Sequence, residues 1–433
     1  MATYQVFPDR PLGTADERLY GQFIEHHHRQ IYGGVWQPGH RLSDEAGFRV
    51  DVLEALQALR IPCLRWPGGC FVSSYHWKDG VGQRVPAFDK AWRVEESNAF
   101  GTDEFMELCR RIGCQPYLCT NAGSGTSEEM SDWVEYCNLE SAGRWARLRR
   151  ANGHPQPYGV RYWSIGNENW GDWEIGAKEL SEWGPFVRES AKMMKHVDPT
   201  IELFAASIAD LDWNVKLLRD AGSLLDWISI HGYWTNYDGQ HEAAYEECMA
   251  TLPQVEEQIV HTKHILGALG MLGRIKVAFD EWNLRHWYHP DFEFGTGDYL
   301  SPRAYNDDDT VYTLADAVFA AGFLHACMRH SDVVRMANFS PVVNSRGAIH
   351  VHEDGLVLRP TYHVFQLYRE QLGSQVLDSY SPDCPSYTVQ GERGMVALEQ
   401  LDALATRRAD GRLALALVNR HATQPLQVRL SQD

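Results

Sequence analysis

The chain has 433 residues, of which 44% are hydrophobic and 23% are charged, a composition typical of a soluble globular protein with a large core. Its length suits one barrel-sized domain together with a small accessory unit. The formal net charge of −18 argues against nucleic acid or an anionic membrane as a partner, and no apolar run approaches the roughly 18–20 residues that span a bilayer.

Eight apolar runs that are typical of buried strands alternate with helical patterns such as 51–59 and 103–111. Repeated strand-then-helix order indicates a parallel sheet with right-handed crossovers. Eight repeats favour an α/β fold of the (β/α)8 TIM barrel type, with an open sheet carrying extra strands as the alternative. The predicted strands are 19–26, 62–69, 115–121, 162–168, 201–207, 227–233, 275–282 and 333–340.

The pattern changes after about residue 372. Segments 386–389, 395–401 and 413–419 resemble strands, and the Asp-Gly pair at 410–411 is a hairpin signal. We therefore predict a small C-terminal antiparallel β-sandwich that includes an N-terminal strand at 4–7. The predicted domains are a catalytic barrel, 15–371, and an accessory sandwich, 372–433 with 1–14.

Two of the predicted strands stop at a glutamate. Glu168 ends the run WSIGNE, and Glu281 lies within AFDEWN. Strand ends of a parallel barrel converge on its catalytic face, so these carboxyls should lie across the barrel mouth from one another. Such a pair is the equipment for cleaving a glycosidic bond. Each glutamate alone could be an ordinary ion-paired residue, but the pair, with Asn167 and Trp282 beside it, favours catalysis.

Other polar residues end neighbouring strands of the predicted barrel. Glu25 ends the first, Arg65 lies in the second, Asn121 ends the third, and His231 and Tyr233 end the sixth. Each could simply cap a strand or form an ion pair, whereas a cluster on one rim favours a substrate site. Long or aromatic-rich connections favour a covered pocket there. These connections are 76–82, 234–240 and 286–299.

Several motifs, taken in chain order, resemble glycoside hydrolase family 51. They are YGQFIEHH (20–27), RWPGGCF (65–71), YHWKDGVG (75–82), IGNENW (165–170), HGY (231–233) and DEWN (280–283). That family consists mainly of α-L-arabinofuranosidases with a clan A (β/α)8 barrel. The resemblance extends through nearly the whole barrel and covers the terminal sandwich weakly.

The resemblance implies a retaining double displacement. Glu168 would be the acid/base and Glu281 the nucleophile. Arg65 would orient the nucleophile, and Tyr233 would donate a hydrogen bond beside it. If the two carboxyls lie about 5–5.5 Å apart, retention follows from the geometry, whereas about 6.5–9.5 Å indicates inversion.

The resemblance also assigns residues to the sugar pocket. Glu25 would bind hydroxyls deep in the pocket, and Asn167 would hold the 2-hydroxyl. Trp92 would form an aromatic wall near the scissile bond, and Cys70 lies where the family has Asn or Cys in contact with the sugar. The implied substrates are arabino- or arabinoxylo-oligosaccharides, cleaved in an exo manner.

Two positions depart from the family pattern. Pro341 takes the place of a Gln that many members have after the eighth strand, and proline has no side-chain hydrogen-bond group. The nucleophile motif is followed by LRHWYH (284–289) instead of a directly adjacent aromatic, so Trp287 is the candidate to take that role. Another furanoside, a β-xyloside, or an endo-glucanase or xylanase substrate is therefore the alternative specificity.

Three other classes of function can be weighed against glycoside hydrolysis. A metal site could use His26, His27 and His28 together with His350 and His352. However, His27 points to the opposite side of a strand from its neighbours, and no further ligand has diagnostic spacing. The glycine-rich segment 121–126 lacks the lysine of a P-loop, and Thr126 with Glu129 favours a helix capping box. A non-catalytic carbohydrate-binding protein would need neither catalytic glutamate.

Nine cysteines without any Cys-x-x-Cys pair favour reduced, structural thiols. The first residues show no basic region followed by an apolar stretch, so no secretory signal is visible. We therefore expect a cytoplasmic enzyme without cofactor or required metal. Its partner is an oligosaccharide substrate, with no nucleic acid or membrane, and we expect a homo-oligomer because the resembled family commonly forms them.

Overall fold

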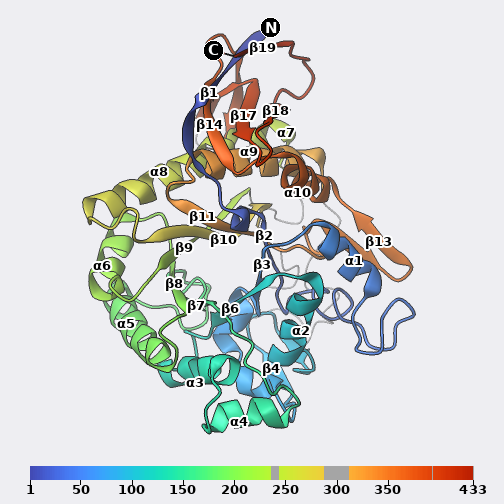
Figure 1. The fold of residues 1–433 in the computed structure, drawn as a ribbon, viewed down its shortest axis with the longest axis vertical. Helices are drawn as coiled ribbons and strands as arrows, with labels where there is room; N and C mark the ends of the chain where they lie inside the picture. The colour runs from blue at the N-terminus through green and yellow to red at the C-terminus, as the bar shows by residue number, and fades with distance from the viewer. Residues whose placement is uncertain (236–242, 287–311, 393, 433) are drawn as a thin grey trace.

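A closed barrel of eight parallel strands forms the centre of the computed structural model, which describes residues 1–235, 243–286, 312–392 and 394–432 (Figure 1). Each barrel strand pairs with the next one along the chain, and the last closes on the first. The predicted (β/α)8 barrel is thus confirmed. Its strands are β2 (Gly21–Phe23), β3 (Cys63–Trp66), β6 (Gln115–Thr120), β7 (Tyr162–Ile165), β8 (Glu202–Ser207), β9 (Trp227–Thr235), β10 (Lys276–Arg285) and β11 (Val334–Phe339).

Helices surround the barrel, and local sequence accounts for the ends of two of them. In α2, the apolar residues 105, 108, 109 and 112 recur on one face and are buried, and Gly113 ends the helix with a left-handed φ of 75°. At α3, Thr126 accepts the backbone N–H of Glu129 at 3.1 Å, as the capping signal predicted. The helices are α1 (Val50–Ala58), α2 (Thr102–Ile112), α3 (Ser127–Asn138), α4 (Arg144–Ala151), α5 (Leu180–Val197), α6 (Leu211–Ala221), α7 (Tyr245–Ala250), α8 (Leu252–Ala268), α9 (Leu314–Arg329) and α10 (Pro360–Gln371).

Several short elements lie between barrel strands and helices. The first predicted strand is shorter than expected, because Glu17–Tyr20 forms a 3-10 helix, η1, whose start is capped by the side chain of Asp16. The other short elements are the 3-10 helices η2 (Cys70–Ser74) and η3 (Trp77–Gly80) and the two-stranded ribbons β4 (Ala87–Asp89) with β5 (Val94–Glu96) and β12 (Ile349–His352) with β13 (Gly355–Leu358).

A layer of buried, mostly aromatic side chains fills the amino-terminal end of the barrel interior. Its members come from seven different strands, and two of them, Phe204 and Trp227, stack with ring centroids 4.8 Å apart. A polar group cannot be placed in such a layer without losing its hydrogen bonds to water. The polar side chains of the interior therefore lie above it, toward the carboxyl ends of the strands. The layer consists of Cys63, Tyr117, Tyr162, Phe204, Trp227, Ala278 and Met336.

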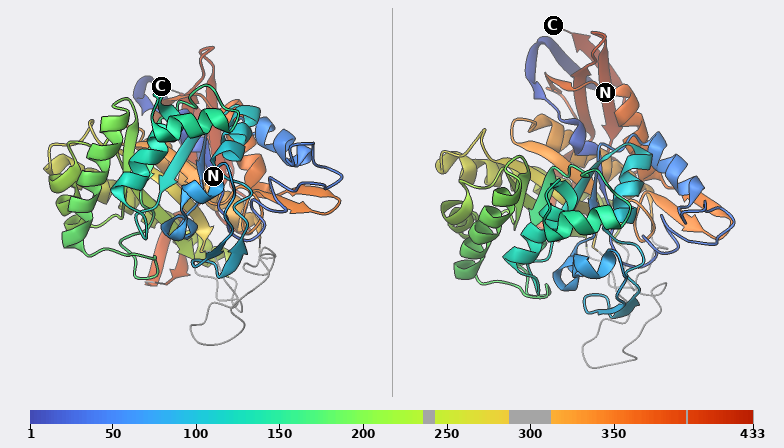
Figure 2. Two further views of the ribbon diagram at one scale, coloured as in Figure 1. Left: turned by 90° about the horizontal axis from the view of Figure 1, so that it is seen from below. Right: turned by 60° about the horizontal axis from the view of Figure 1, so that its bottom comes forward.

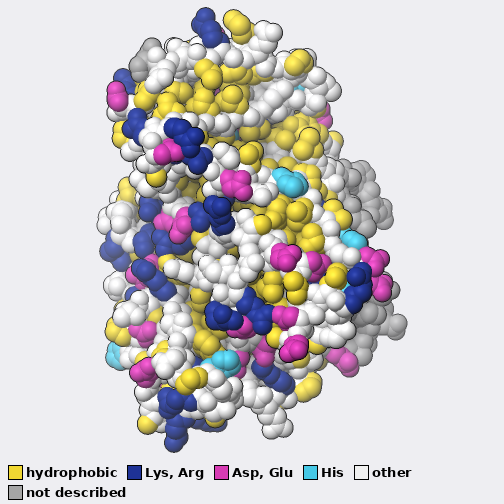
Figure 3. Space-filling view, turned by 45° about the vertical axis from the view of Figure 1, so that its right-hand side comes forward, with side chains coloured by type: hydrophobic (Ala, Val, Ile, Leu, Met, Phe, Trp, Pro, Cys, Tyr) yellow, Lys and Arg dark blue, Asp and Glu magenta, His cyan; other side chains and the backbone are white. Residues whose placement is uncertain are grey.

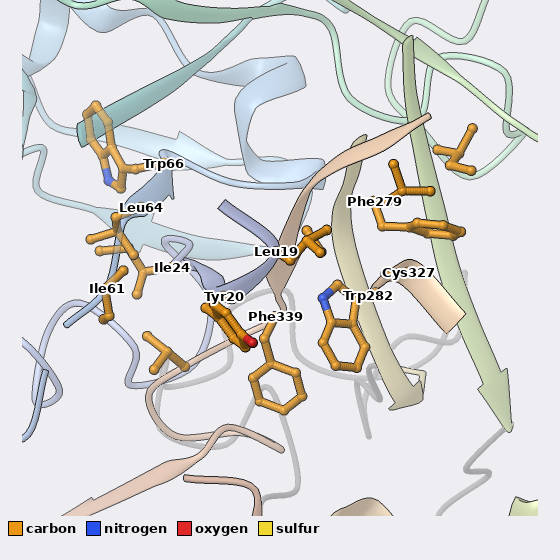
Figure 4. Close-up of a cluster of buried hydrophobic side chains, with 14 of the residues drawn as sticks. Leu19, Tyr20, Ile24, Ile61, Leu64, Trp66, Phe279, Trp282, Cys327 and Phe339 are labelled. Atoms are coloured by element: carbon orange, nitrogen blue, oxygen red, sulfur yellow. The ribbon is translucent and has the colours of Figure 1, made fainter. Parts of the chain in front are cut away.

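A second core lies between the strands and the surrounding helices (Figure 4). Trp282 of β10 points outward into this core and stacks on Phe323 of α9, with ring centroids 3.6 Å apart. Phe279 and Phe339 pack beside these rings. This packing fixes the outer face of β10, and with it the position of the inner face that carries the site.

The C-terminal residues form a sheet at one end of the molecule, with both chain termini beside it (Figures 1 and 2). Its strand order is β18-β17-β14-β1-β19, and all pairs are antiparallel except β1 with β19. The prediction of a mostly antiparallel C-terminal unit joined by the N-terminal strand is confirmed, while the boundary at 371/372 stays a prediction. The strands are β1 (Ala2–Thr14), β14 (Gln375–Tyr380), β17 (Leu401–Arg407), β18 (Leu413–Asn419) and β19 (Val428–Gln432), with a separate hairpin of β15 (Ser386–Gly391) and β16 (Gly394–Glu399).

Three further features bear on the sequence predictions: the turn at Gly411, the state of the cysteines and the apolarity of the helices. Gly411, in the predicted turn between β17 and β18, has a φ of 86° and donates its N–H to the carbonyl of Arg408 at 2.9 Å. All nine cysteines carry free thiols. Among the helices of the described ranges, none has the length and apolarity needed to cross a membrane.

Candidate active site

Five of the polar side chains predicted at the strand ends line one cavity of about 450 Å³ at the carboxyl end of the barrel. Glu168 follows β7, Glu281 lies in β10, and His231 and Tyr233 lie in β9. Parallel strands bring these residues together although the two glutamates are over a hundred positions apart. The lining residues are Glu25, Cys70, Trp92, Glu168, Trp170, Trp173, His231, Gly232, Tyr233, Gln258, Glu281 and His286.

Glu281 is held at both carboxylate oxygens. Arg65 donates from Nη1 to Oε2 at 2.8 Å, and the Tyr233 hydroxyl donates to Oε1 at 2.7 Å. Burial raises the pKa of Tyr233 well above its usual value, as does the charge of Glu281, so this hydroxyl stays a donor. Both contacts fix the orientation of the Glu281 carboxyl group.

Asp280 lies beneath the two catalytic candidates, although alternation along a strand should turn it away from Glu281. The register of β10 with its neighbours shifts between Ala278 and Glu281, and such a bulge re-aims side chains. Asp280 accepts hydrogen bonds from the hydroxyls of Tyr117 and Ser229. Burial favours its neutral form, but the charge of Arg65 and the contact with His231 outweigh burial and lower its pKa to about 2.

Glu168 is bound on both sides by ring nitrogens. Oε1 lies 2.8 Å from His231 Nδ1, and Oε2 accepts the Trp173 indole N–H at 2.7 Å. Burial favours neutral Glu168, but the hydrogen bond and charge of His231 outweigh it, so the pKa of Glu168 lies below its usual value.

His231 faces three carboxylates. Burial opposes its charge, but Glu281, Asp280 and Glu168 together raise the pKa of His231 to about 10. Its Nε2 lies 3.3 Å from Asp280 Oδ1. In the free protein, the lowered pKa of Glu168 and the raised pKa of His231 favour the proton on His231, whose Nδ1 lies 2.8 Å from Glu168 Oε1. This arrangement keeps a transferable proton next to the proposed acid.

The two carboxyls lie close to each other. One oxygen of Glu168, one oxygen of Glu281 and a ring nitrogen of His231 all lie within 4.8 Å of one another. An inverting glycosidase leaves room for a water molecule between carboxyls about 6.5–9.5 Å apart, whereas a retaining one brings them to about 5–5.5 Å. The observed separation matches the retaining arrangement.

Glu25 lies at the bottom of the cavity. Its Oε1 accepts the backbone N–H of Phe71 at 2.9 Å and the indole N–H of Trp92 at 3.0 Å. Burial, and next the charge of Glu281, raise the pKa of Glu25 well above its usual value. The loop after β3 approaches it so closely that a Cβ on Gly68 would lie 2.4 Å from Glu25 Cγ.

Asn167 connects the two halves of the site. Its Oδ1 accepts from Arg65 Nη2 at 2.8 Å, and its Nδ2 donates to Glu174 Oε2 at 3.3 Å. Asn167 thus shares Arg65 with Glu281. Cys70, the first residue of η2, also lines the cavity.

Asn121 is placed differently from the other predicted residues. Arg65, Asn167 and Asn121 are all absent from the cavity lining, but Arg65 and Asn167 are hydrogen-bonded into the site, whereas the amide of Asn121 organises its own loop. Oδ1 accepts the backbone N–H groups of residues 123, 124 and 125, and Nδ2 donates to the carbonyl of Tyr75 at 2.9 Å. The glycine-rich segment is therefore built around Asn121 itself.

The two departures from the family pattern have different outcomes. Trp287 lies outside the described residues, as do most of segment 286–299 and residues 236–240. Pro341 is buried and does not line the cavity. The neighbouring Ser340 has its hydroxyl 2.8 Å from the Tyr233 hydroxyl, so the segment after β11 contacts the site through Ser340.

The histidine run is used within the fold. His26 lies 3.1 Å from Glu96 Oε2 and stacks on Phe71, with ring centroids 4.4 Å apart. His27 packs against Trp92, with centroids 4.1 Å apart. In the described part of the chain, neither cluster with metal-ligand spacing includes a residue of this run; both lie in the cavity and contain Glu168.

Sequence reasoning missed six residues that face the cavity or support it: Trp170, Trp173, Glu174, Gln258, Asp280 and His286. The aromatic spacing in NWGDWE directly after Glu168 was an available signal for the first two. His286 was inside a segment that we predicted to cover the pocket. Glu174 and Asp280 gave no signal, because loop geometry and a bulge bring them inward.

A parallel barrel whose mouth holds two close carboxyls, one bound to Arg and Tyr and the other to His, defines a glycoside hydrolase. Comparison with known proteins agrees. The family model described as "Alpha-L-arabinofuranosidase 1 domain" matches residues 55–249, and "Alpha-L-arabinofuranosidase C-terminal domain" matches residues 280–432. The second match begins inside the barrel, at β10.

Curated relatives and solved structures cover nearly the whole chain. "Probable alpha-L-arabinofuranosidase C" of Aspergillus terreus is 34% identical over 98% of this chain and 86% of its own length. "Intracellular exo-alpha-(1->5)-L-arabinofuranosidase" of Halalkalibacterium halodurans is 32% identical over 99% and 86%. The α-L-arabinofuranosidase of Thermotoga maritima, solved in complex with arabinose, aligns with a TM-score of 0.89 at 38% identity, over 100% of this chain and 88% of its own. The chain belongs to the α-L-arabinofuranosidase family, glycoside hydrolase family 51.

Proposed function

We propose that this protein is a retaining, exo-acting α-L-arabinofuranosidase that releases arabinofuranose from arabino- or arabinoxylo-oligosaccharides. The observation that carries the proposal is the 4.8 Å limit on the separation of Glu168 and Glu281 oxygens. Family membership and the printed activities of the relatives support the substrate class. Neither cofactor nor metal enters the reaction.

The residues divide the reaction into two displacements. Glu281, oriented by Arg65 and Tyr233, attacks the anomeric carbon as a carboxylate, and Glu168 transfers its proton to the departing oxygen. The bond to the leaving group breaks as the ester to Glu281 forms. Glu168, now ionised, takes a proton from water, whose oxygen attacks the anomeric carbon and releases Glu281.

The cavity explains how one sugar ring is held. Glu25, whose pKa is raised by burial, hydrogen-bonds ring hydroxyls at the bottom of the cavity. Asn167 has one amide hydrogen beyond its contact with Glu174, and the 2-hydroxyl takes it. Trp92 closes one side of the ring, and Cys70 contacts the sugar opposite.

Glu281→Ala tests the nucleophile. Turnover is expected to be abolished, since no group remains to form the ester. Azide in the medium should restore glycosyl transfer and give a product with inverted configuration, because a single displacement replaces two. Measurement is by product release and by NMR of the glycosyl azide. Wild-type-like hydrolysis by this variant removes the assignment.

Glu168→Ala tests the acid. Hydrolysis of a nitrophenyl arabinofuranoside should suffer much less than hydrolysis of an arabino-oligosaccharide, because a nitrophenolate departs without protonation. The ratio of kcat/KM for the two substrates, variant against wild type, gives the answer. Equal losses on both substrates count against an acid role for Glu168.

Specificity is tested with nitrophenyl glycosides of α-L-arabinofuranose, β-D-galactofuranose, β-D-xylose and β-D-glucose. Arabinofuranoside turnover should dominate, because Glu281 and Glu25 lie in motifs that resemble the family and the relatives are named as arabinofuranosidases. Turnover of another glycoside with silence on arabinofuranoside would support the alternative specificity, set by the segment around Pro341.

The proposal also includes a cytoplasmic location and self-association of the protein. A cytoplasmic location is supported by relatives whose names say intracellular. Self-association is supported by an apolar groove of about 670 Å³ between α9, α10 and β18, bordered by exposed Leu314, Leu367 and Leu417. Figure 3 shows hydrophobic side chains gathered over the C-terminal end of the molecule. Light scattering of the purified protein measures its oligomeric state.

A further inference from the structure

A cysteine and two glutamates converge beside the cavity. One carboxyl oxygen of Glu168, one of Glu174 and the sulfur of Cys70 all lie within 4.8 Å of one another. Cys70 belongs to η2 and is partly exposed, whereas Glu174 lies between β7 and α5 with 3% of its surface exposed. Two separate loops thus bring one sulfur and two oxygen atoms to the same place.

Two buried polar atoms at this place have no hydrogen-bond partner among the described residues. They are Glu174 Oε1 and the hydroxyl oxygen of Ser73, a residue of η2 that lies beside the Glu174 carboxyl. The other oxygen of Glu174 accepts from Asn167 at 3.3 Å. Leaving a buried polar atom unsatisfied costs about 1–3 kcal/mol. A ligand that bonds to Glu174 and orders Ser73 would remove this cost.

The two loops that carry the cluster are packed tightly around Gly123. A Cβ on Gly123 would lie 2.4 Å from the carbonyl oxygens of both Ser73 and Ile175, and a Cβ on Gly176 would lie 2.6 Å from Gly123 Cα. The backbone N–H of Ser124 also donates to the carbonyl of Ser73 at 2.9 Å. This packing fixes η2 relative to residues 174–176, so the sulfur and the carboxyl are held close before a ligand binds.

Groups that become negative are crowded in the cluster. Burial, and next the charges of Glu174 and Glu168, raise the pKa of the Cys70 thiol well above its usual value. Burial, and next the charge of Glu168, raise the pKa of Glu174 to about 7. Besides burial, both shifts have the same cause, which is repulsion between like charges at close range. A cation bound among these groups would relieve that repulsion.

The cations of the site pair with other carboxylates. Arg65 lies 2.8 Å from Glu281, and His231 lies 2.8 Å from Glu168. Within the described ranges, Glu174 has no Lys, Arg or His at ion-pair distance, and no cation is among the main groups that shift its pKa. The ligand atoms of Cys70 and Glu174 are therefore not neutralised by a charged side chain.

The donor atoms favour zinc over other cations. Zinc binds thiolate sulfur at about 2.3 Å and carboxylate oxygen at about 2.0–2.2 Å, whereas magnesium and calcium take oxygen ligands alone. Two ligand atoms on one zinc ion are thus at most about 4.5 Å apart. Atoms that already lie within 4.8 Å of one another need only small side-chain rotations to share the ion. Three protein ligands also leave a fourth position for water.

We propose that Cys70, Glu168 and Glu174 bind one zinc ion and that zinc bound there inhibits glycoside cleavage. The sulfur and the two carboxylates each donate a lone pair to the ion, and the protons of Cys70 and Glu174 pass to solvent. Each oxygen of Glu168 accepts one hydrogen bond and keeps a second lone pair for the ion. Binding does not depend on the proposed function. Inhibition rests on the proposed role of Glu168 as acid/base, because a metal-bound carboxylate carries no proton to the leaving group.

Calorimetric titration with zinc chloride tests the site in protein that has been freed of metal with a chelator. Wild type should bind one ion. Cys70→Ser and Glu174→Gln should each weaken binding at least about tenfold, because even the loss of an outer partner of a metal ligand typically costs 10- to 100-fold. The matched controls are Cys384→Ser, a partly exposed thiol in the C-terminal unit, and Asp172→Asn, an exposed carboxyl two residues from Glu174. Equal affinity in all five proteins overturns the proposal.

Cobalt(II) in place of zinc reports on the sulfur directly. A thiolate-to-cobalt charge-transfer band in the near ultraviolet should appear in wild type and in Cys384→Ser, and it should be missing in Cys70→Ser. This measurement decides the question even if Glu174→Gln does not fold. A band that persists in Cys70→Ser, or that is absent from wild type, shows that Cys70 is not a ligand and overturns the site.

Inhibition is measured on an arabino-oligosaccharide with zinc at the concentration that saturates the site in wild type. The rate should fall at least about a hundredfold, which is the contribution typical of a general acid, and a chelator should restore it. Relative to its own zinc-free rate, Cys70→Ser should lose less activity at the same zinc concentration, and Cys384→Ser should lose as much as wild type.

The two levels of inference fail differently. Zinc that binds through Cys70 in wild type and leaves the rate unchanged overturns the inhibition and counts against Glu168 as the acid. A normal leaving-group effect in Glu168→Ala, together with zinc affinity that Cys70→Ser leaves unchanged, removes the zinc site alone.

Discussion

At the residue scale, one tyrosine hydroxyl links the proposed nucleophile to the last barrel strand. Tyr233 donates to Glu281 at 2.7 Å, and its oxygen lies 2.8 Å from Ser340 Oγ. Because Tyr233 stays protonated over the whole working range, its contribution to Glu281 is a fixed hydrogen bond to a charged group. Such bonds contribute about 1.5–3 kcal/mol.

Tyr233→Phe should therefore lower kcat/KM about 10- to 100-fold, since each 1.36 kcal/mol is about tenfold. The fold should be unaffected, because the ring is retained. Steady-state kinetics on the nitrophenyl arabinofuranoside measure the loss. Ser340→Ala is the matched control and should lower kcat/KM less than about threefold, because the Tyr233 hydroxyl keeps its bond to Glu281. An equal loss of kcat/KM in both variants would contradict the role of Tyr233 in holding Glu281.

Sequence reasoning found the residues at this scale whose positions follow from strand ends. Glu168, Glu281, Arg65, Tyr233 and Glu25 all reach the interior from the carboxyl ends of predicted strands. The same reasoning failed for Asn121, which ends a strand but turns its amide back into its own loop. Strand-end position predicts the rim, whereas side-chain direction there depends on the loop that follows.

At the element scale, the loop after β3 is shaped around Glu25. Gly68 has a φ of 156°, and a Cβ there would lie 2.4 Å from Glu25 Cγ and 2.8 Å from its carboxyl carbon. The motif RWPGGC therefore needs small residues for close approach, in addition to any conformational need. No spacing rule reveals which side chain a glycine loop approaches, so this contact could not be predicted.

Gly68→Ala should displace Glu25 and break its hydrogen bond with Trp92. We expect kcat/KM to fall by about tenfold or more, mostly through KM, because the bottom of the sugar pocket moves. Gly113→Ala is the matched control: it has a φ of 75° with no atom within 4 Å of the added Cβ, so it should cost about 1 kcal/mol of stability and no activity. Wild-type KM in Gly68→Ala would contradict the role of this loop.

The bulge in β10 is the second element-scale feature that sequence could not supply. Strict alternation would place Asp280 and Glu281 on opposite faces of the strand. The register shift between Ala278 and Glu281 lets Asp280 approach His231 while Trp282 still packs outward. The barrel strands were predictable from apolar runs, but the bulge that completes the site depends on pairing with β9.

At the scale of the whole molecule, the C-terminal sheet is attached to the barrel through a buried charge. Asp402 of β17 lies 3.1 Å from Arg329 Nη1 and 3.1 Å from His325 Nδ1, both in α9. Burial favours neutral Asp402, but His325 and Arg329 outweigh it and hold its pKa below the usual value. The sequence predicted an accessory sheet from alternating residues, but gave no sign of this long-range contact.

Asp402→Asn should destabilise the protein at neutral pH by about 3 kcal/mol, because it leaves Arg329 without its buried partner. The pKa of Asp402 is lower in the folded protein than in the unfolded chain, where it is about 4. The stabilisation that ionised Asp402 gives the folded protein is therefore present above about pH 4 and is lost as the pH falls below that value. Chemical unfolding of both proteins at pH 7 and at pH 3.5 should show the difference narrowing in acid. Asp378→Asn, on the exposed face of the same sheet where it pairs with Arg10 at 3.5 Å, is the control and should change stability by less than about 1 kcal/mol. A difference between wild type and Asp402→Asn that stays constant with pH would mean that the charge of Asp402 does not hold the sheet to the barrel.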